Sequence, residues 1–123
     1  MDFTGEERVI AMEKNKKSTS DLLHETSGLA VRYLNEIGDR AVAPSPEAIE
    51  ALSALGGSVP EDTSDAAEVI RLLDGIGSPA TMATAGPRYF GFVVGGSLPV
   101  TVAANWLAGA WDQGAAASLV SPV

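Results

Sequence analysis

The chain has 123 residues, a formal net charge of −8 at pH 7 and no cysteine. The lack of cysteine excludes disulfide bonds, thiolate catalysis and cysteine-ligated zinc. The acidic balance argues against nucleic acid as a partner, because phosphate binding requires clustered lysine and arginine side chains. Lys14, Lys16 and Lys17 do cluster, but acidic residues stand beside them. The acidic N-terminus lacks the basic-then-apolar pattern of a secretory signal and predicts a cytoplasmic location.

Two amphipathic helices are expected in the first half of the chain. The first follows capping hydroxyls at Ser18–Ser20, carries apolar residues at three- and four-residue spacing, and ends at Gly38. The second has Ser45 as its N-cap and Pro46 in its first position, where the missing N–H costs nothing. Gly56-Gly57 ends it.

A third helix is expected to start in the acidic stretch Glu61–Asp65, because negative charge is favourable at the positive end of a helix dipole. The stretch Gly75–Pro79 is expected to stop it. Each of the three helices has one apolar and one charged face, which is typical of helices packed on a larger body.

The segment Ile76–Val123 carries charge only at Arg88 and Asp112, so we expect another part of the protein, a partner or a membrane to cover it. The aromatic and β-branched run Tyr89–Val94 predicts an extended segment. Beyond Gly95-Gly96, Ser97 is expected to cap a helix that has Pro99 in its first turn. That helix is apolar nearly all round, which predicts that it is buried.

The sequence disfavours a membrane span, a phosphate-binding loop and a histidine-based site. The uncharged run Tyr89–Trp111 is long enough to span a bilayer, but its glycines, Pro99 and polar residues favour a buried strand, turn and helix. The glycines of Gly91–Ser97 lack the spacing and the lysine of a phosphate-binding loop. The only histidine, His24, has no nearby cysteine with which to bind a metal and no nucleophile partner.

One long motif in the second half resembles a known enzyme family. The run from Gly86 to Pro99, followed by Ala103–Ala108 and Ala110–Gln113, closely resembles the pyridoxal-phosphate-dependent group II decarboxylases. This family includes the aromatic-amino-acid and glutamate decarboxylases. Shorter upstream pieces and a last motif look like the same family: Arg32–Leu34, Val42–Pro44, Ile76–Thr81 and Ser121-Pro122.

The resemblance implies an α/β fold, the aminotransferase-like fold type I of pyridoxal-phosphate enzymes, in a longer parent of which this chain is the N-terminal fragment. Residues 1–80 would form a helical segment that wraps the partner subunit of a homodimer. Residues 81–123 would begin the large cofactor-binding domain. The fragment itself is expected to be mostly α-helical with one short extended segment.

The resemblance also implies the chemistry, which is decarboxylation of an amino-acid substrate on pyridoxal 5'-phosphate. The family's Schiff-base lysine, ring aspartate and stacking histidine match no position of this sequence, so no catalytic, cofactor-binding or metal residue is assigned. We expect the 123-residue chain alone to be inactive.

Carried over position by position, the resemblance assigns five substrate-binding residues. Phe92, Val93, Val94 and Gly95 would line the side-chain pocket, and Gln113 would reach across the dimer. Aromatic-amine-forming relatives often have a second aromatic and a proline in place of Val93 and Val94, so the substrate stays open. An alternative for the two residues also stays open, namely that Phe92 and Val93 are core residues. An alternative for the whole chain is a non-catalytic helical interaction module or an inactive remnant.

Overall fold

The computed structural model describes residues 17–114, which are mostly helical and contain no strand within that range. The four labelled helices are α2 (Thr19–Glu36), α3 (Pro46–Ala51), α4 (Ala66–Leu72) and α5 (Pro99–Trp111). Three short helical turns extend them, η1 (Leu52–Leu55), η2 (Leu73–Gly77) and η3 (Ser78–Ala80). The helical character predicted for this chain is therefore confirmed.

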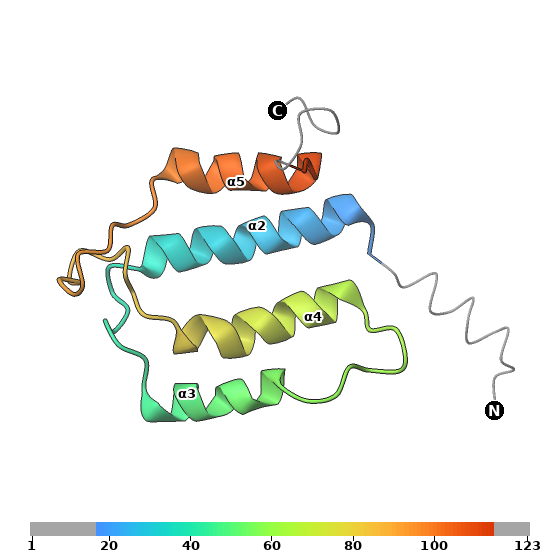
Figure 1. Cartoon of the computed structure of the whole chain (residues 1–123), viewed down its shortest axis with the longest axis horizontal. Coiled ribbons are helices and arrows are strands. Elements are labelled where there is room, and N and C mark those ends of the chain that lie inside the picture. The colour runs from blue at the N-terminus through green and yellow to red at the C-terminus, as the bar shows by residue number, and fades with distance from the viewer. Residues whose placement is uncertain (1–16, 115–123) are drawn as a thin grey trace, which may run out of the picture.

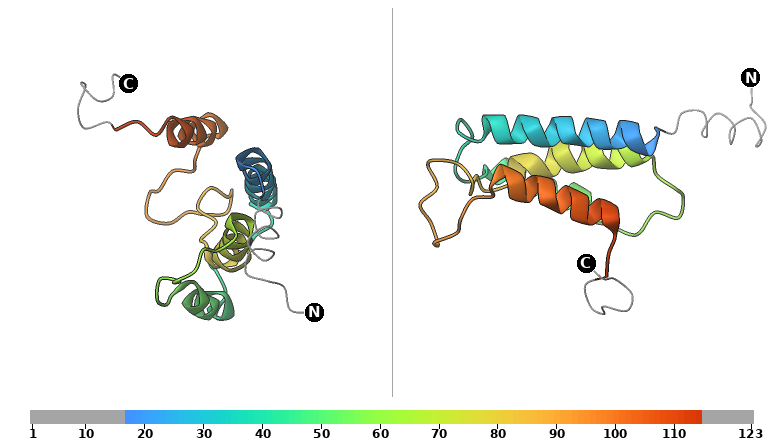
Figure 2. Two further views of the ribbon diagram at one scale, coloured as in Figure 1. Left: turned by 90° about the vertical axis from the view of Figure 1, so that its right-hand side faces the viewer. Right: turned by 90° about the horizontal axis from the view of Figure 1, so that it is seen from above.

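The helices lie side by side in the order α5, α2, α4, α3 (Figure 1). Helices α2 and α4 run in one direction, and α3 and α5 run in the other. An end-on view shows that they form one curved row (Figure 2). Because stable domains bury apolar faces between two or more layers, a single row leaves its faces uncovered.

The predicted helix starts are confirmed by their hydrogen bonds. Ser45 Oγ accepts from Ala48 N at 3.2 Å, with Pro46 in the first position of α3. Asp65 Oδ1 accepts from Glu68 N at 3.0 Å and caps α4. Caps of this kind each stabilise a helix by about 1 kcal/mol.

One predicted helix boundary is wrong. The N-cap of α5 is Leu98 and not Ser97, and it makes no side-chain capping bond. The third helix, α4, ends at Leu72, and the turns η2 and η3 carry the helical path through the predicted stop Gly75–Pro79 to Ala80. Glycine keeps the N–H group that a helix needs, and it lowers helix stability by only about 1 kcal/mol relative to alanine. It therefore weakens a helix without ending it. Pro79 fits because it lies in the first turn of η3.

The part of the chain that the structure describes has almost no core. Only Ala67 and Ala83 are buried there. Large apolar side chains are exposed on every helix, including Trp106 and Trp111 on α5. Among the described residues α5 is exposed, so the cover that its apolar surface is expected to need does not come from this part of the chain.

Exposed ion pairs link α2 to α4 and to the turn η2 that follows it. Glu25 pairs with Lys17 and, at 3.2 Å, with Nη1 of Arg71 on α4. Arg32 pairs with Asp74. Surface pairs of this type contribute about 0–1 kcal/mol each, so they orient the two helices without replacing a core.

The start of α2 has a reciprocal cap that should respond to pH. Ser18 Oγ donates to Asp21 Oδ2 at 2.6 Å and accepts from Asp21 N at 3.1 Å. The hydrogen bond from Ser18 is the largest cause that lowers the pKa of Asp21 from 3.8, and the charges of His24 and Lys17 add to it. A lowered pKa means that the contribution to stability is present above pH 3.8 and is lost as the pH falls below it.

We therefore expect the Asp21 carboxyl carbon to titrate in NMR with a midpoint below 3.8. Ser18→Ala should raise that midpoint toward 3.8, because it removes the largest cause of the shift. Ser53→Ala is a matched control, since Ser53 Oγ bonds only Glu50 O on another helix. An Asp21 midpoint unchanged by Ser18→Ala would contradict the assignment.

Candidate functional site

Four of the five residues that the resemblance assigns to substrate lie in one closed loop. We call residues 85–96, between η3 and α5, the wall loop. Its two ends meet, because a Cβ added to Gly96 would lie 3.2 Å from the Cα of Ala85. Compact surface loops with adjoining ends are frequently functional.

The tip of the wall loop turns sharply and is not extended. Phe92 has φ 53° and Val93 has φ 52°, both in the left-handed region. The extended segment predicted for Tyr89–Val94 is therefore wrong. An extended strand needs a neighbour to pair its N–H and C=O groups, and the described residues offer no strand. Left-handed backbone costs about 1–2 kcal/mol at a residue such as valine, and strain of this kind clusters at binding sites.

The large side chains at the tip stand in solvent. The exposed fraction is 93% for Phe90, 91% for Phe92 and 105% for Val93. Val94 is half exposed. Neither Phe92 nor Val93 is buried by the other described residues.

The base of the wall loop is fixed by side chains from three segments. We call Tyr33, Arg40, Ser78, Thr81 and Arg88 the anchor cluster. Arg40 lies over the Tyr33 ring, with Cζ 4.5 Å from the centroid, and its Nη2 donates to Ser78 O. Arg88 Nη2 donates to Arg40 O. Thr81 Oγ1 donates its only proton to Ser78 O at 2.8 Å. The Tyr33 hydroxyl is therefore the donor in its 2.8 Å hydrogen bond with Thr81 Oγ1.

Backbone contacts hold the same base. Ala83, one of the two buried residues, donates its N–H to Val42 O at 3.0 Å. A Cβ on Gly86 would lie 3.0 Å from Ile37 O, so the chain passes there only because Gly86 has no side chain. The tip is thus presented from a base that is tied to the connection between α2 and α3.

Gln113 is not brought to the other four residues. It follows the far end of α5, whose 13 residues correspond to a length of about 20 Å. Its Nε2 donates to Trp111 O at 2.7 Å. Within one chain, Gln113 and the wall loop therefore do not form a common pocket.

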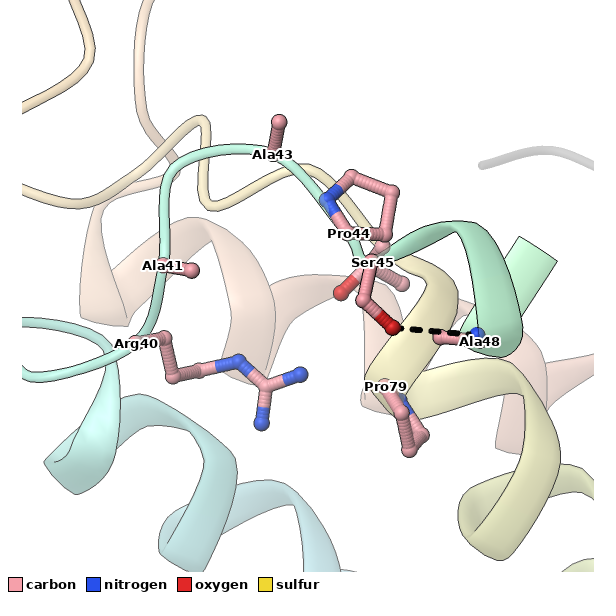
Figure 3. A pocket seen from close by; sticks show the side chains of 8 residues that line it. Arg40, Ala41, Ala43, Pro44, Ser45, Ala48 and Pro79 are labelled. Carbon is pink, nitrogen blue, oxygen red and sulfur yellow. Dashed lines mark hydrogen bonds between the residues drawn. The ribbon is translucent and has the colours of Figure 1, made fainter.

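A shallow hollow of about 240 Å³ lies beside the anchor cluster. Figure 3 shows the Arg40 guanidinium projecting into it, between Ala41 and Pro79. The Ser45 hydroxyl at its edge is already engaged with Ala48 N. The hollow is lined by Arg40, Ala41, Ala43, Pro44, Ser45, Ala48, Pro79 and Thr81.

Sequence reasoning did not single out the anchor cluster as functional. Tyr33 lies in one of the upstream pieces that resemble the family, and Arg88 is the lone cation of the back third. Those two signals were present, but Arg40 also donates to Ser78 O, 38 residues further along the chain, and no local pattern specifies that contact.

The described residues do not fit a pyridoxal-phosphate site. Their only lysine, Lys17, is ion-paired with Glu25. Their only histidine, His24, bonds Ser20 O of its own helix at 2.7 Å through Nδ1. Over residues 17–114 no three His, Asp or Glu side chains are grouped to hold a metal, and no helix is long and apolar enough to cross a membrane. No catalytic step is derived from these side chains.

A comparison with family models, with curated proteins and with solved structures finds no match for this chain. The resemblance to the decarboxylases therefore stays a prediction from the sequence motifs.

Proposed function

We propose that this chain is the N-terminal part of a cytoplasmic, homodimeric pyridoxal-phosphate-dependent amino-acid decarboxylase of fold type I. Such an enzyme converts an amino acid to an amine and carbon dioxide, and the cofactor supplies the electron sink for that loss. In this proposal residues 1–80 belong to the dimer interface and residues 81–123 begin the large domain. The cofactor ligands come from the parent beyond this chain.

The observation that carries the proposal is the wall loop. The motif that resembles the family folds into a closed loop whose apolar tip is exposed and whose base is held by the anchor cluster. A fixed base with an exposed tip is what a pocket wall requires, because a bound side chain then meets groups that are already in place. Phe92, Val93, Val94 and Gly95 form that tip, and Gln113 is a residue for the opposite side of the dimer.

The uncovered helix row supports the dimer part of the proposal. Obligate dimer interfaces are large and apolar and resemble a domain core cut in half. The apolar side chains of α2, α4 and α5 are exposed in the described chain, as such an interface would require.

The same exposed faces favour one alternative, a non-catalytic helical module that binds another protein. The two functions differ in a direct measurement on the complete product of the gene that encodes this chain. The decarboxylase should bind pyridoxal phosphate and release carbon dioxide from an amino acid, whereas the module should do neither.

Variants of the tip test the assigned wall in that complete product. Burial of a phenylalanine or valine side chain contributes about 1.5–3 kcal/mol, so Phe92→Ala should raise KM at least about tenfold. Val59→Ala is the matched control, because Val59 is 89% exposed in the connection between η1 and α4. An unchanged KM in Phe92→Ala would contradict the assignment of the wall loop to the substrate pocket.

A further inference from the structure

One side chain of the wall loop reaches outside the loop. Within residues 85–96 only Arg88 is charged, and among the side chains of this loop it is the one that makes a hydrogen bond to another segment. Its Nη2 donates to Arg40 O, in the connection between α2 and α3, 48 positions earlier in the chain. A charged donor makes a stronger hydrogen bond than a neutral one, and no side-chain rotation can withdraw a backbone acceptor.

The acceptor is itself held in place. The Arg40 side chain donates from Nη2 to Ser78 O, and its Cζ lies 4.5 Å from the centroid of the Tyr33 ring. Two hydrogen bonds from a guanidinium to a carbonyl therefore follow one another, first from the wall loop to the connection between α2 and α3, and then from that connection to η3. The position of the loop depends on the second bond as well as on the first, because the first ends on the backbone of Arg40.

The residue after Arg88 links the base of the loop to its tip. Tyr89 is half-buried and donates its N–H to Gly86 O at 3.2 Å. Its hydroxyl lies against the tip, since a Cβ added to Gly91 would lie 3.2 Å from that oxygen. By contrast, both phenylalanine side chains of the loop are almost fully exposed and have little around them to hold them. The base of the loop therefore fixes the position of the tip.

Resting on the proposed function, we infer that Arg88 is a positioning residue for the substrate pocket. It holds the wall loop on Arg40, and so joins the first residues of the large domain to the helical segment 1–80, which in the proposed function belongs to the dimer interface. Arg88 acts on the substrate through the tip of the loop and not by contact, since its hydrogen bond lies at the base. Substrate affinity then depends on a segment that does not itself line the pocket.

Steady-state kinetics of the complete gene product loaded with cofactor test this role, with the amino acid that the wild type decarboxylates at the highest kcat/KM. Arg88→Ala should raise KM about fivefold or more and change kcat by less than about twofold, because the apparent affinity falls with the fraction of molecules whose wall is in place. Arg88→Lys should restore most of the loss, since the bond uses a single terminal nitrogen. Arg71→Ala is the matched control, because it removes an arginine from an exposed ion pair on α4 and should leave KM unchanged. An unchanged KM in Arg88→Ala, or a fall in kcat alone, overturns the inference and leaves the proposed function intact.

The double variant Arg40→Ala/Arg88→Ala separates positioning from direct contact with the substrate. If the two bonds act in series, the rise in KM of the double variant is smaller than the product of the rises in the two single variants. Rises that multiply would mean that Arg88 acts on the substrate independently of Arg40, and would overturn the inference. If the complete gene product releases no amine from any amino acid, the proposed function fails and the inference falls with it.

Discussion

The isolated 123-residue chain should show a broad thermal transition with no cooperative unfolding step. Ordering a residue costs about 1–2 kcal/mol of backbone entropy, and burial of apolar surface is the main term that offsets it. Only two alanines are buried in the described range, so little offsets that cost. Capped helices such as α2 should retain some helical content, because their hydrogen bonds are local.

Circular dichroism at 222 nm against temperature measures this, with size-exclusion chromatography at several concentrations beside it. We expect a gradual loss of helix and concentration-dependent association through the exposed apolar faces. Under the proposed function a second layer and a partner subunit bury those faces, so the complete gene product should instead melt in a sharp transition. A monodisperse isolated chain with a sharp melt would contradict this and favour the interaction module.

Arg40→Ala should destabilise the complete gene product by about 2–4 kcal/mol. The change removes the hydrogen bond from a charged guanidinium to Ser78 O, which contributes about 1.5–3 kcal/mol. It also removes the stacking on Tyr33, which contributes about 0.5–1 kcal/mol at an exposed site. Ser78 O would retain its bond from Thr81 Oγ1. The base of the wall loop would therefore weaken without losing all its contacts.

Urea unfolding of Arg40→Ala, Arg40→Lys and wild type measures the effect. Arg40→Lys should recover only part of the stability, because a lysine lacks the planar fork that both stacks and donates. Arg71→Ala is the matched control, since its pair with Glu25 is exposed and should contribute about 1 kcal/mol or less. Equal losses in the free energy of unfolding in Arg40→Ala and Arg71→Ala would show that Arg40 stabilises the protein no more than an exposed ion pair does.

The sequence was most reliable where structure depends on neighbours along the chain. Ser18, Ser45 and Asp65 begin helices because their side chains bond an N–H three residues further on. The one boundary that was mispredicted depends on more than local preference, because Ser97 has a suitable hydroxyl but Leu98 is the N-cap of α5.

The residues Phe92 to Gly95 were named from a motif and are consecutive in the chain, so their assignment to a substrate site stays a prediction. Their conformation was mispredicted, because aromatic and β-branched residues favour strands only where a neighbouring strand can pair with them. Gln113 was assigned to the same function, but α5 separates it from the loop within this chain.

The sequence by itself determined the helical segments and their caps, because these depend on local hydrogen bonds. It also determined that few residues beyond Ile76 are charged, because this is a matter of composition. Only the tertiary structure decided that the helices form one row, that α5 is exposed and that Phe92 and Val93 form a left-handed turn. It also decided that Arg40 joins Tyr33, Ser78 and Arg88. The hydrogen bonds that Arg40 makes with Ser78 and Arg88 join residues 38 and 48 positions apart, and no local pattern specifies such contacts.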